Sequence, residues 1–392
     1  MFENIRNQLK PGGEGMKRVA VLLSVLVLGL VFGALGAEKI SIGVLGKCVH
    51  PYWDVVRIGV EAAAKKFPDV QATFWVPQIE DIPGQISTVE AWIAAKYQAL
   101  SLAPSDPGAM AGVIKRALEA GIPVITHDTD APGTGRYFYL GTGNYAFGRA
   151  AGEAMLKLLG GPEAARGKKV IIITGSLTAL NSLERIKGFR DVVEPAGVVV
   201  VDVLNDREDV STAVSLVEAA LSAYPDLAGI YGVYAASTTG LARALETAGK
   251  TDQIIGVGVD TIKEHLQFLE KGALDTVVGQ RQYYMGYHSV TLMRIAVKYG
   301  IEKLIAALAT TGALQAQGLS KSEIIKFLTP VFPSEVVDTI GLLLDTGIVV
   351  RVGGAPDGAL FLDTGSDVVT RDNLQEMLAT WEAMGLPMEL FK

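Results

Sequence analysis

The feature that most constrains the fold of this chain is a regular alternation of short apolar runs with longer amphipathic segments. Runs such as residues 170–173 and 198–201 contain only Val and Ile, which is typical of strands buried on both faces of a parallel sheet. Between the runs, residues such as Val56, Val60 and Ala63 keep helical spacing. This alternation predicts an α/β fold with doubly wound parallel sheets.

The number of predicted strands indicates more than one sheet. The strand-like runs are residues 39–46, 70–76, 99–103, 123–128, 136–141, 168–174, 198–204, 229–234, 254–260 and 276–280. This is more strands than one open sheet usually contains, and the chain of 392 residues is long enough for two lobes. Ligands of such sheets bind beyond the carboxyl ends of the strands. We therefore expect functional residues directly after each strand.

Residues 1–37 are predicted to be a leader rather than part of the fold. Basic residues precede an uncharged apolar run, 19–37, which ends in small residues. This order is that of a secretory signal, with cleavage near Gly36 and Ala37, and it predicts export to the periplasm or the cell exterior. The alternative is a retained membrane anchor, because the run approaches the roughly 20 residues that span a bilayer.

Charge and composition disfavour several classes of function. Lys and Arg number 35 against 42 Asp and Glu, so the net charge of −7 disfavours nucleic acid as a partner. The single cysteine, Cys48, excludes an internal disulfide, and the four histidines form no close pair, so we expect no metal and no cofactor. Neither a GxGxxG fingerprint after the first strand nor a GxSxG elbow is present. We expect a protein that is not an enzyme.

The segment after the first predicted strand carries the densest group of candidate binding residues. Lys47, His50, Tyr52 and Trp53 lie within seven positions. Flat aromatic faces suit the C–H faces of a sugar or cyclitol ring and exclude water from it. The alternative is that the aromatic rings only pack the start of the following helix.

Carboxylates follow two predicted strands that are far apart in the sequence. Asp128 and Asp130 follow the fourth strand, and Asp260 ends the ninth. A carboxylate at the end of a buried strand can accept charge-assisted hydrogen bonds from two adjacent hydroxyls, although it can also cap the next helix. Weaker polar candidates follow other strands: Asn181, Tyr234, Gln280 and Arg281.

From about residue 38 to residue 299, the chain resembles the type I periplasmic sugar-binding proteins, the solute-binding subunits of ABC importers similar to the ribose-binding protein. The motifs that carry this resemblance are residues 50–53, 121–128, 184–189, 258–260 and 279–280. Among the subfamilies, the chain looks most like proteins assigned to myo-inositol and related polyols.

The resemblance implies roles for several residues. By motif position, the ring-stacking aromatics of the family fall on Tyr52 and Trp53, and His50 takes the place of a ligand-binding asparagine. The first-lobe aspartate falls on Asp128, while Asp260 and Gln280 are retained.

Other family positions are altered. An arginine is replaced by Thr129, a second-lobe arginine by Leu183 with Asn181 as the nearby polar candidate, and an asparagine by Tyr234. With Lys47 gained, these changes imply a polyol or a pyranose rather than ribose.

The resemblance also implies two lobes joined by three crossovers, near residues 143–144, near 280–281 and in the C-terminal region. Lobe 1 is expected to comprise residues 38–144 and 281–298, and lobe 2 residues 145–280 and 355–392. Residues 299–354 depart from the family as a helical addition.

The implied function is to bind a small polyhydroxy ligand without chemistry and deliver it to the membrane permease of an ABC transporter. The alternative is a membrane-anchored sugar sensor of the chemoreceptor type.

Overall fold

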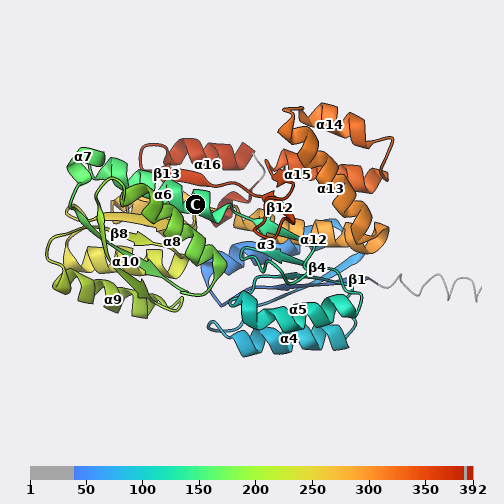
Figure 1. The fold of residues 1–392 in the computed structure, drawn as a ribbon, viewed down its shortest axis with the longest axis horizontal. Coiled ribbons are helices and arrows are strands. Elements are labelled where there is room, and N and C mark those ends of the chain that lie inside the picture. Colours follow the sequence, from blue (N-terminus) through green and yellow to red (C-terminus); the bar gives the residue numbers. More distant parts are fainter. Residues whose placement is uncertain (1–38, 384–385, 392) are drawn as a thin grey trace, which may run out of the picture. The chain divides into compact units, whose positions relative to one another are not determined.

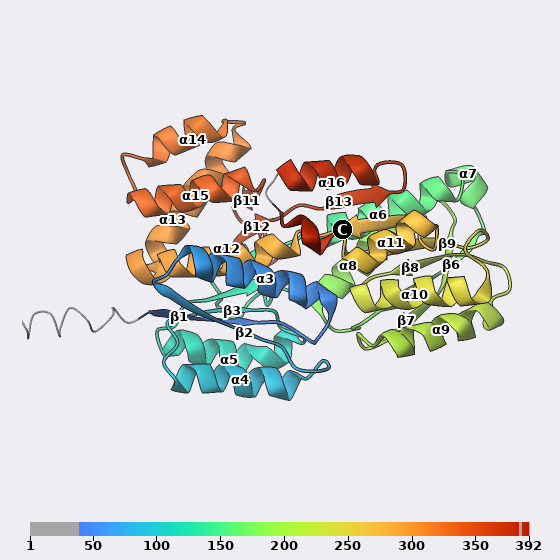
Figure 2. The ribbon, with the colours of Figure 1, turned by 180° about the vertical axis from the view of Figure 1, so that it is seen from behind.

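Two sheets, each with helices on both faces, organise the chain (Figure 1 and Figure 2). The computed structural model describes residues 39–383 and 386–391, so the predicted leader lies outside the described residues. The prediction of two doubly wound α/β lobes is confirmed. Within the described ranges, no helix is both long and apolar enough to cross a membrane.

The first sheet has the strand order β11-β12-β5-β4-β3-β1-β2, and only β11 is antiparallel to its neighbour. Its first five strands in sequence are β1 (Ile40–Leu45), β2 (Val70–Trp75), β3 (Ala99–Leu102), β4 (Val124–His127) and β5 (Phe138–Gly141). The helices that cover it are α3 (Pro51–Lys66), α4 (Ile82–Ala94), α5 (Pro107–Glu119) and α12 (Gln282–Tyr299).

Alternation along the strands explains why both faces of this sheet are covered. Ile42 and Val44 share one cluster with α3 and α12, whereas Leu45, Leu100 and Leu102 share another with α4 and α5. Successive side chains of a strand point to opposite faces, so an apolar run must be covered twice.

The second sheet repeats the strand order of the first, as β13-β10-β9-β8-β6-β7, with β13 antiparallel to β10. Its parallel strands are β6 (Lys169–Thr174), β7 (Val199–Asn205), β8 (Leu227–Gly232), β9 (Ile255–Val259) and β10 (Thr276–Gly279). Around it lie α6 (Asn144–Leu158), α7 (Pro162–Ala165), α8 (Leu180–Val193), α9 (Val210–Ala223), α10 (Ala235–Ala248) and α11 (Lys263–Lys271).

A glycine pair brings α6 and α8 into backbone contact. A Cβ on Gly148 would lie 2.0 Å from the carbonyl oxygen of Arg185, and a Cβ on Gly188 would lie 2.1 Å from that of Tyr145. Only glycine permits this approach. The close packing positions the first turns of α8, which carry Arg185, against the end of the second sheet.

The chain passes between the two sheets at three places within the described residues. It crosses after β5 at Gly143, after β10 at Gln280 and Arg281, and between β12 and β13 at residues 364–366. The first two crossovers are joined by a hydrogen bond of 3.0 Å that the Thr142 hydroxyl donates to Oε1 of Gln280. The prediction of three crossovers, two of them near residues 143–144 and 280–281, is confirmed.

The assignment of all of residues 355–392 to lobe 2 is corrected. Strand β12 (Leu360–Asp363) pairs in parallel with β5 of the first sheet, and only β13 (Asp367–Thr370) joins the second. An apolar run in sequence does not say which sheet supplies its hydrogen bonds, because strand pairing is non-local. After β13 come α16 (Leu374–Ala383) and a short 3₁₀ helix, η1 (Met388–Leu390).

The addition at residues 299–354 is helical except at its end. Its helices are α13 (Ile301–Ala316), α14 (Lys321–Leu328) and α15 (Ser334–Asp345). Ser320 and Glu323 form a capping box at the start of α14. The segment then adds β11 (Val349–Arg351), an antiparallel edge strand of the first sheet, which was not among the strands predicted from the sequence.

Candidate ligand-binding site

Loops at the carboxyl ends of both sheets line a small cavity, in which the side chains leave a space of about 20 Å³. Its lining residues are Lys47, His50, Tyr52, Trp53, Asp128, Arg185, Glu208, Tyr234, Ala235, Ala236, Asp260 and Gln280. Eight of the eleven residues singled out from the sequence are in this set. In this closed arrangement the space is about that of one water molecule, so a bound ring would require the two lobes to move apart.

The start of α3 directs the aromatic residues into the cavity. His50 is the N-cap, and its Nδ1 accepts a hydrogen bond of 3.2 Å from the backbone N–H of Tyr52. Pro51 follows at the first helical position, where the missing N–H has no cost. Gly46 leaves room for the indole, because a Cβ there would lie 2.6 Å from Cε3 of Trp53. The aromatic rings therefore both pack the helix start and line the cavity.

His50 is uncharged in this setting. Burial, together with the neighbouring His265, lowers the pKa of His50 to about 4. A neutral imidazole suits its capping role, since Nδ1 must accept.

Asp128 is held as an ionised carboxylate. Its Oδ1 accepts a hydrogen bond of 2.5 Å from the hydroxyl of Tyr52, and its Oδ2 accepts one of 2.8 Å from Thr129. Burial by itself would raise the pKa of Asp128, but the charges of Lys47 and Arg185 and these hydrogen bonds lower it. Asp128 thus brings a fixed negative charge to the wall of the cavity.

Asp260 faces the same cavity from the second lobe. Its Oδ1 accepts a hydrogen bond of 2.8 Å from Nε2 of Gln280. Burial raises the pKa of Asp260 to about 7, although the charge of Arg185 and the bond from Gln280 act in the opposite direction. Near neutral pH, this group can therefore both accept and donate.

Lys47 places an ammonium group in the wall of the cavity. Its Nζ lies 3.6 Å from Oδ2 of Asp128 and 5.4 Å from the centroid of the Tyr234 ring. The side chain is 1% exposed, and Nζ has no hydrogen-bond partner among the described residues. Burial opposes its charge, but the neighbouring Tyr234 and the carboxylates of Asp128 and Glu208 raise the pKa of Lys47. An acceptor on a ligand would complete its coordination.

Arg185 is a cavity residue that the sequence analysis missed. Its Nε donates to Oδ1 of Asn144 at 2.9 Å, its Nη1 donates to the carbonyl of Val233 at 3.0 Å, and its Nη2 has no partner in the described structure. The sequence analysis followed Leu183, which is 47% exposed. The helical period was the available signal, because Asn181, Ser182 and Arg185 share the buried face of α8.

Three predicted residues do not line this cavity. Asp130 forms a buried ion pair with Arg136 at 2.5 Å, and Asn181 lies behind Tyr234, whose hydroxyl donates to its Oδ1 at 2.6 Å. Arg281 pairs with Asp367 at 3.3 Å. Asp130 and Arg281 come shortly after strands and Asn181 lies in the first turn of α8. The side chains of all three turn to protein partners. Their assignment as ligand-binding residues stays a prediction.

Loops of the two lobes also contact each other around the cavity. The thiol of Cys48 in the first lobe donates a hydrogen bond of 3.2 Å to Oε2 of Glu208 in the second, and Cys48, Tyr52 and Trp53 share an apolar cluster with Ala235. The arrangement is closed over the cavity.

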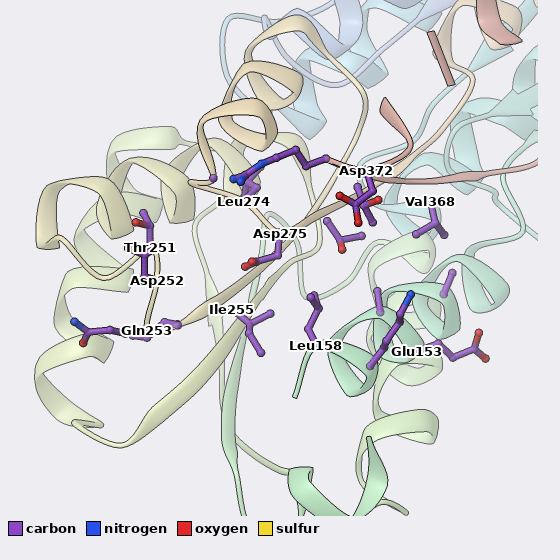
Figure 3. A pocket seen from close by; sticks show the side chains of 18 residues that line it. Glu153, Leu158, Thr251, Asp252, Gln253, Ile255, Leu274, Asp275, Val368 and Asp372 are labelled. Atoms are coloured by element: carbon purple, nitrogen blue, oxygen red, sulfur yellow. The ribbon is translucent and has the colours of Figure 1, made fainter. Parts of the chain in front are cut away.

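A wider, open hollow lies at the amino ends of β9 and β10 (Figure 3). Leu158, Ile255, Asp275 and Val368 are among its lining residues. The carboxylate of Asp275 accepts a hydrogen bond of 2.8 Å from the backbone N–H of Gly256, so it is engaged by the protein itself. Among the described residues, no converging set of buried polar groups faces this hollow, and it does not resemble a built ligand site.

The chemistry available at the cavity is recognition by hydrogen bonds and ring contacts. Across residues 39–383 and 386–391, no group of three or more His, Cys, Asp or Glu side chains is arranged to hold a metal ion. Burial and the neighbouring Glu208 raise the pKa of Cys48, which keeps its thiol protonated and a poor nucleophile.

The chain is similar to known binding proteins in both sequence and structure. Residues 43–301 match the family described as periplasmic binding protein domain. A D-ribose/D-allose-binding protein of Pseudomonas aeruginosa is 31% identical over 199 residues, which is 49% of this chain and 60% of that protein. The chain thus covers less than two thirds of that relative's own length. The ribose import binding protein of Salmonella typhimurium is 25% identical over 277 residues, covering 70% of this chain and 90% of that protein.

A solved structure extends the likeness to the fold. The solute-binding protein of an ABC transporter from Burkholderia graminis, in complex with D-arabinose, has a TM-score of 0.67 and 26% sequence identity. The match covers 86% of this chain and 97% of that one.

Proposed function

Because this chain belongs to the periplasmic binding protein family, we propose that it is an exported protein that captures a sugar or cyclitol between its two lobes and delivers it to the permease of an ABC transporter. The observation that carries the proposal is the convergence of Asp128 and Asp260, one from each lobe, on one cavity that also contains Tyr52 and Trp53. The ligands of the relatives, ribose, allose and arabinose, support a polyhydroxy ring.

Binding proceeds by closing the two lobes on the ligand. The ring hydroxyls donate to the carboxylates of Asp128 and Asp260 and accept from Lys47 and Arg185, while the aromatic side chains cover the apolar faces of the ring. A ligand that gains these contacts only when the lobes are closed shifts the balance from open to closed by its differential affinity. Hinge closure of this kind is the general behaviour of periplasmic binding proteins as a class.

The ligand leaves unchanged, because the cavity groups bind rather than react. Asp128 has its oxygens engaged by Tyr52 and Thr129, and the only cysteine has a raised pKa. A dissociation constant in the micromolar range, about −8 kcal/mol, is strong enough for capture and weak enough for release at a permease.

A thermal-shift panel tests this proposal. The protein without its leader is heated with myo-inositol, glucose, galactose, xylose, ribose, allose and arabinose. At least one of these is expected to raise the melting temperature in a saturable way, since a ligand that binds only the folded state stabilises it by mass action. If no polyhydroxy ring stabilises the protein, the proposal is wrong.

A further inference from the structure

Glu208 is a cavity residue that neither its sequence context nor the family motifs singled out. It lies in the loop between β7 and α9, where Arg207 and Glu208 have left-handed backbone angles, with φ of 57° and 56°. Two successive non-glycine residues in this region are uncommon and mark a loop held in a specific shape.

Neighbouring residues hold this loop and its side chain in place. The backbone N–H groups of Arg207 and Glu208 donate to Asn205 and Asp206 at 3.0 and 2.8 Å. Gly175 makes room for the side chain, because a Cβ there would lie 2.4 Å from Cγ of Glu208. The fold therefore aims this carboxylate at the first lobe.

The partner of Glu208 across the lobes is weak. The Cys48 thiol donates to its Oε2 at 3.2 Å, and a thiol is a poor donor. The other charged groups that act on Glu208 are Lys47 after β1, Glu80 after β2 and Asp128 after β4. Among them, only Lys47 is a cation. Glu80 also has a buried Oε1 without a partner in the described structure.

The cavity consequently holds more negative than positive groups. Its cations are Lys47 and Arg185, and its carboxylates are Asp128, Asp260 and Glu208. A charge on a buried group is felt more strongly than one at a surface. With all three carboxylates ionised, a negatively charged ligand would enter a site that already has one excess negative charge.

We propose that Glu208 determines specificity by excluding sugar acids, so that the cavity selects an uncharged ring. This inference rests on the proposed function and adds the substrate class. Specificity of this kind depends on a repulsive element as well as on attractive contacts. Lys47 and Arg185 would otherwise attract a carboxylate, since each has a nitrogen without a hydrogen-bond partner among the described residues.

The experiment compares two ligands that differ in charge and not in size: glucuronate and glucuronamide, with galacturonate and galacturonamide as a second pair. Each competes with the tightest neutral sugar of the panel at pH 8 and at pH 6, in the wild-type protein and in Glu208→Gln. Glu218→Gln, an exposed glutamate on α9 of the same lobe, is the control.

At pH 8, the wild-type protein is expected to bind the amide at least tenfold more tightly than the acid. This ratio should fall at least threefold at pH 6 and in Glu208→Gln, while Glu218→Gln keeps the wild-type ratio. Burial raises the pKa of both Glu208 and Asp260 to about 7, which predicts the fall with pH, and in Glu208→Gln only the part due to Asp260 should remain. A structural role alone would not change the ratio.

The proposal is overturned if the acid binds as well as the amide, or if Glu208→Gln keeps both the wild-type ratio and its change with pH. It is also overturned if neither amide competes, because size and not charge would then exclude the acids. If no neutral sugar binds the wild-type protein at all, the proposed function itself fails, which is a separate result.

Discussion

Asp128 and Asp260 lie at matching positions of the two lobes, directly after β4 and β9, and both turn the chain into the left-handed region, with φ of 59° and 66°. Each strand is the fourth of its sheet, counted from β2 in the first and from β7 in the second. A left-handed backbone conformation costs conformational energy in a non-glycine residue and is often kept at functional sites. Asp tolerates this conformation better than most residues. The turn brings both carboxylates back over the strand ends, where they face one cavity.

Replacing Asp260 by alanine should weaken ligand binding. The Asp260→Ala change removes a hydroxyl partner and leaves the amide of Gln280 without its acceptor, so we expect a loss of tenfold to hundredfold, since hydrogen bonds to charged groups contribute about 1.5–3 kcal/mol. Isothermal titration with the tightest sugar of the panel measures the loss. Asp252→Ala, at an exposed aspartate just before β9, is the control, and equal affinities of the two variants would contradict the assignment.

Affinity for a neutral sugar should rise as the pH falls from 8 to about 6.5, above the range in which His50, whose pKa burial lowers to about 4, would oppose the trend. Burial raises the pKa of both Asp260 and Glu208 to about 7 in the closed protein, above the usual values of about 4 for solvated carboxyls. The closed state therefore binds more protons than an open, solvated one. Above pH 7, closing the lobes costs free energy, because the two carboxylates are buried in their charged form. This cost decreases as the pH falls through 7 and disappears below the pKa values of solvated carboxyls.

Asp128 does not oppose this trend, because its pKa is lowered and it stays ionised in that window. Titrations in buffers of different ionisation enthalpy should show proton uptake on binding, and Asp260→Asn should take up fewer protons. Proton release on binding would show that the sign is wrong.

Ligand should protect Cys48 from alkylation. The thiol is 3% exposed and lies at the contact between the lobes, against Glu208, so opening is needed to expose it. Because it is the only cysteine, any incorporation of iodoacetamide reports on this position. Labelling is expected to slow at least tenfold at saturating sugar and to be fast in denaturant. An unchanged rate with bound sugar would mean that the lobes do not separate.

Replacing Asp130 by asparagine should destabilise the protein and spare ligand affinity. Asp130→Asn breaks a buried pair with Arg136, and removing one partner of such a pair costs about 3 kcal/mol. Urea unfolding measures the loss, with sugar affinity determined on the folded variant. Asp226→Asn, which removes an exposed pair with Lys169, is the control and should cost less than about 1 kcal/mol. A loss of sugar affinity of more than threefold in Asp130→Asn would instead indicate that Asp130 contacts the ligand.

Much of the site could be predicted because it follows the ends of strands. Lys47, Asp128 and Asp260 were found by asking which polar residues come directly after a buried run, and the structure places all three at the cavity. The same rule also selected Asp130 and Arg281, which pair with Arg136 and Asp367 instead. Proximity to a strand end decides where a backbone lies, but a rotamer and its available partner decide where a side chain points.

The amino-acid sequence by itself determined the elements and their layering, because the periods of two and 3.6 residues depend only on local geometry and on which side chains avoid water. Tertiary structure alone decided that β12 pairs with the first sheet, that Arg185 enters the cavity from α8, and that Glu208 meets Cys48 across the lobes. These relationships join residues that are far apart in the chain. Hydrogen bonds and charge interactions between such residues produce no periodic pattern in the sequence.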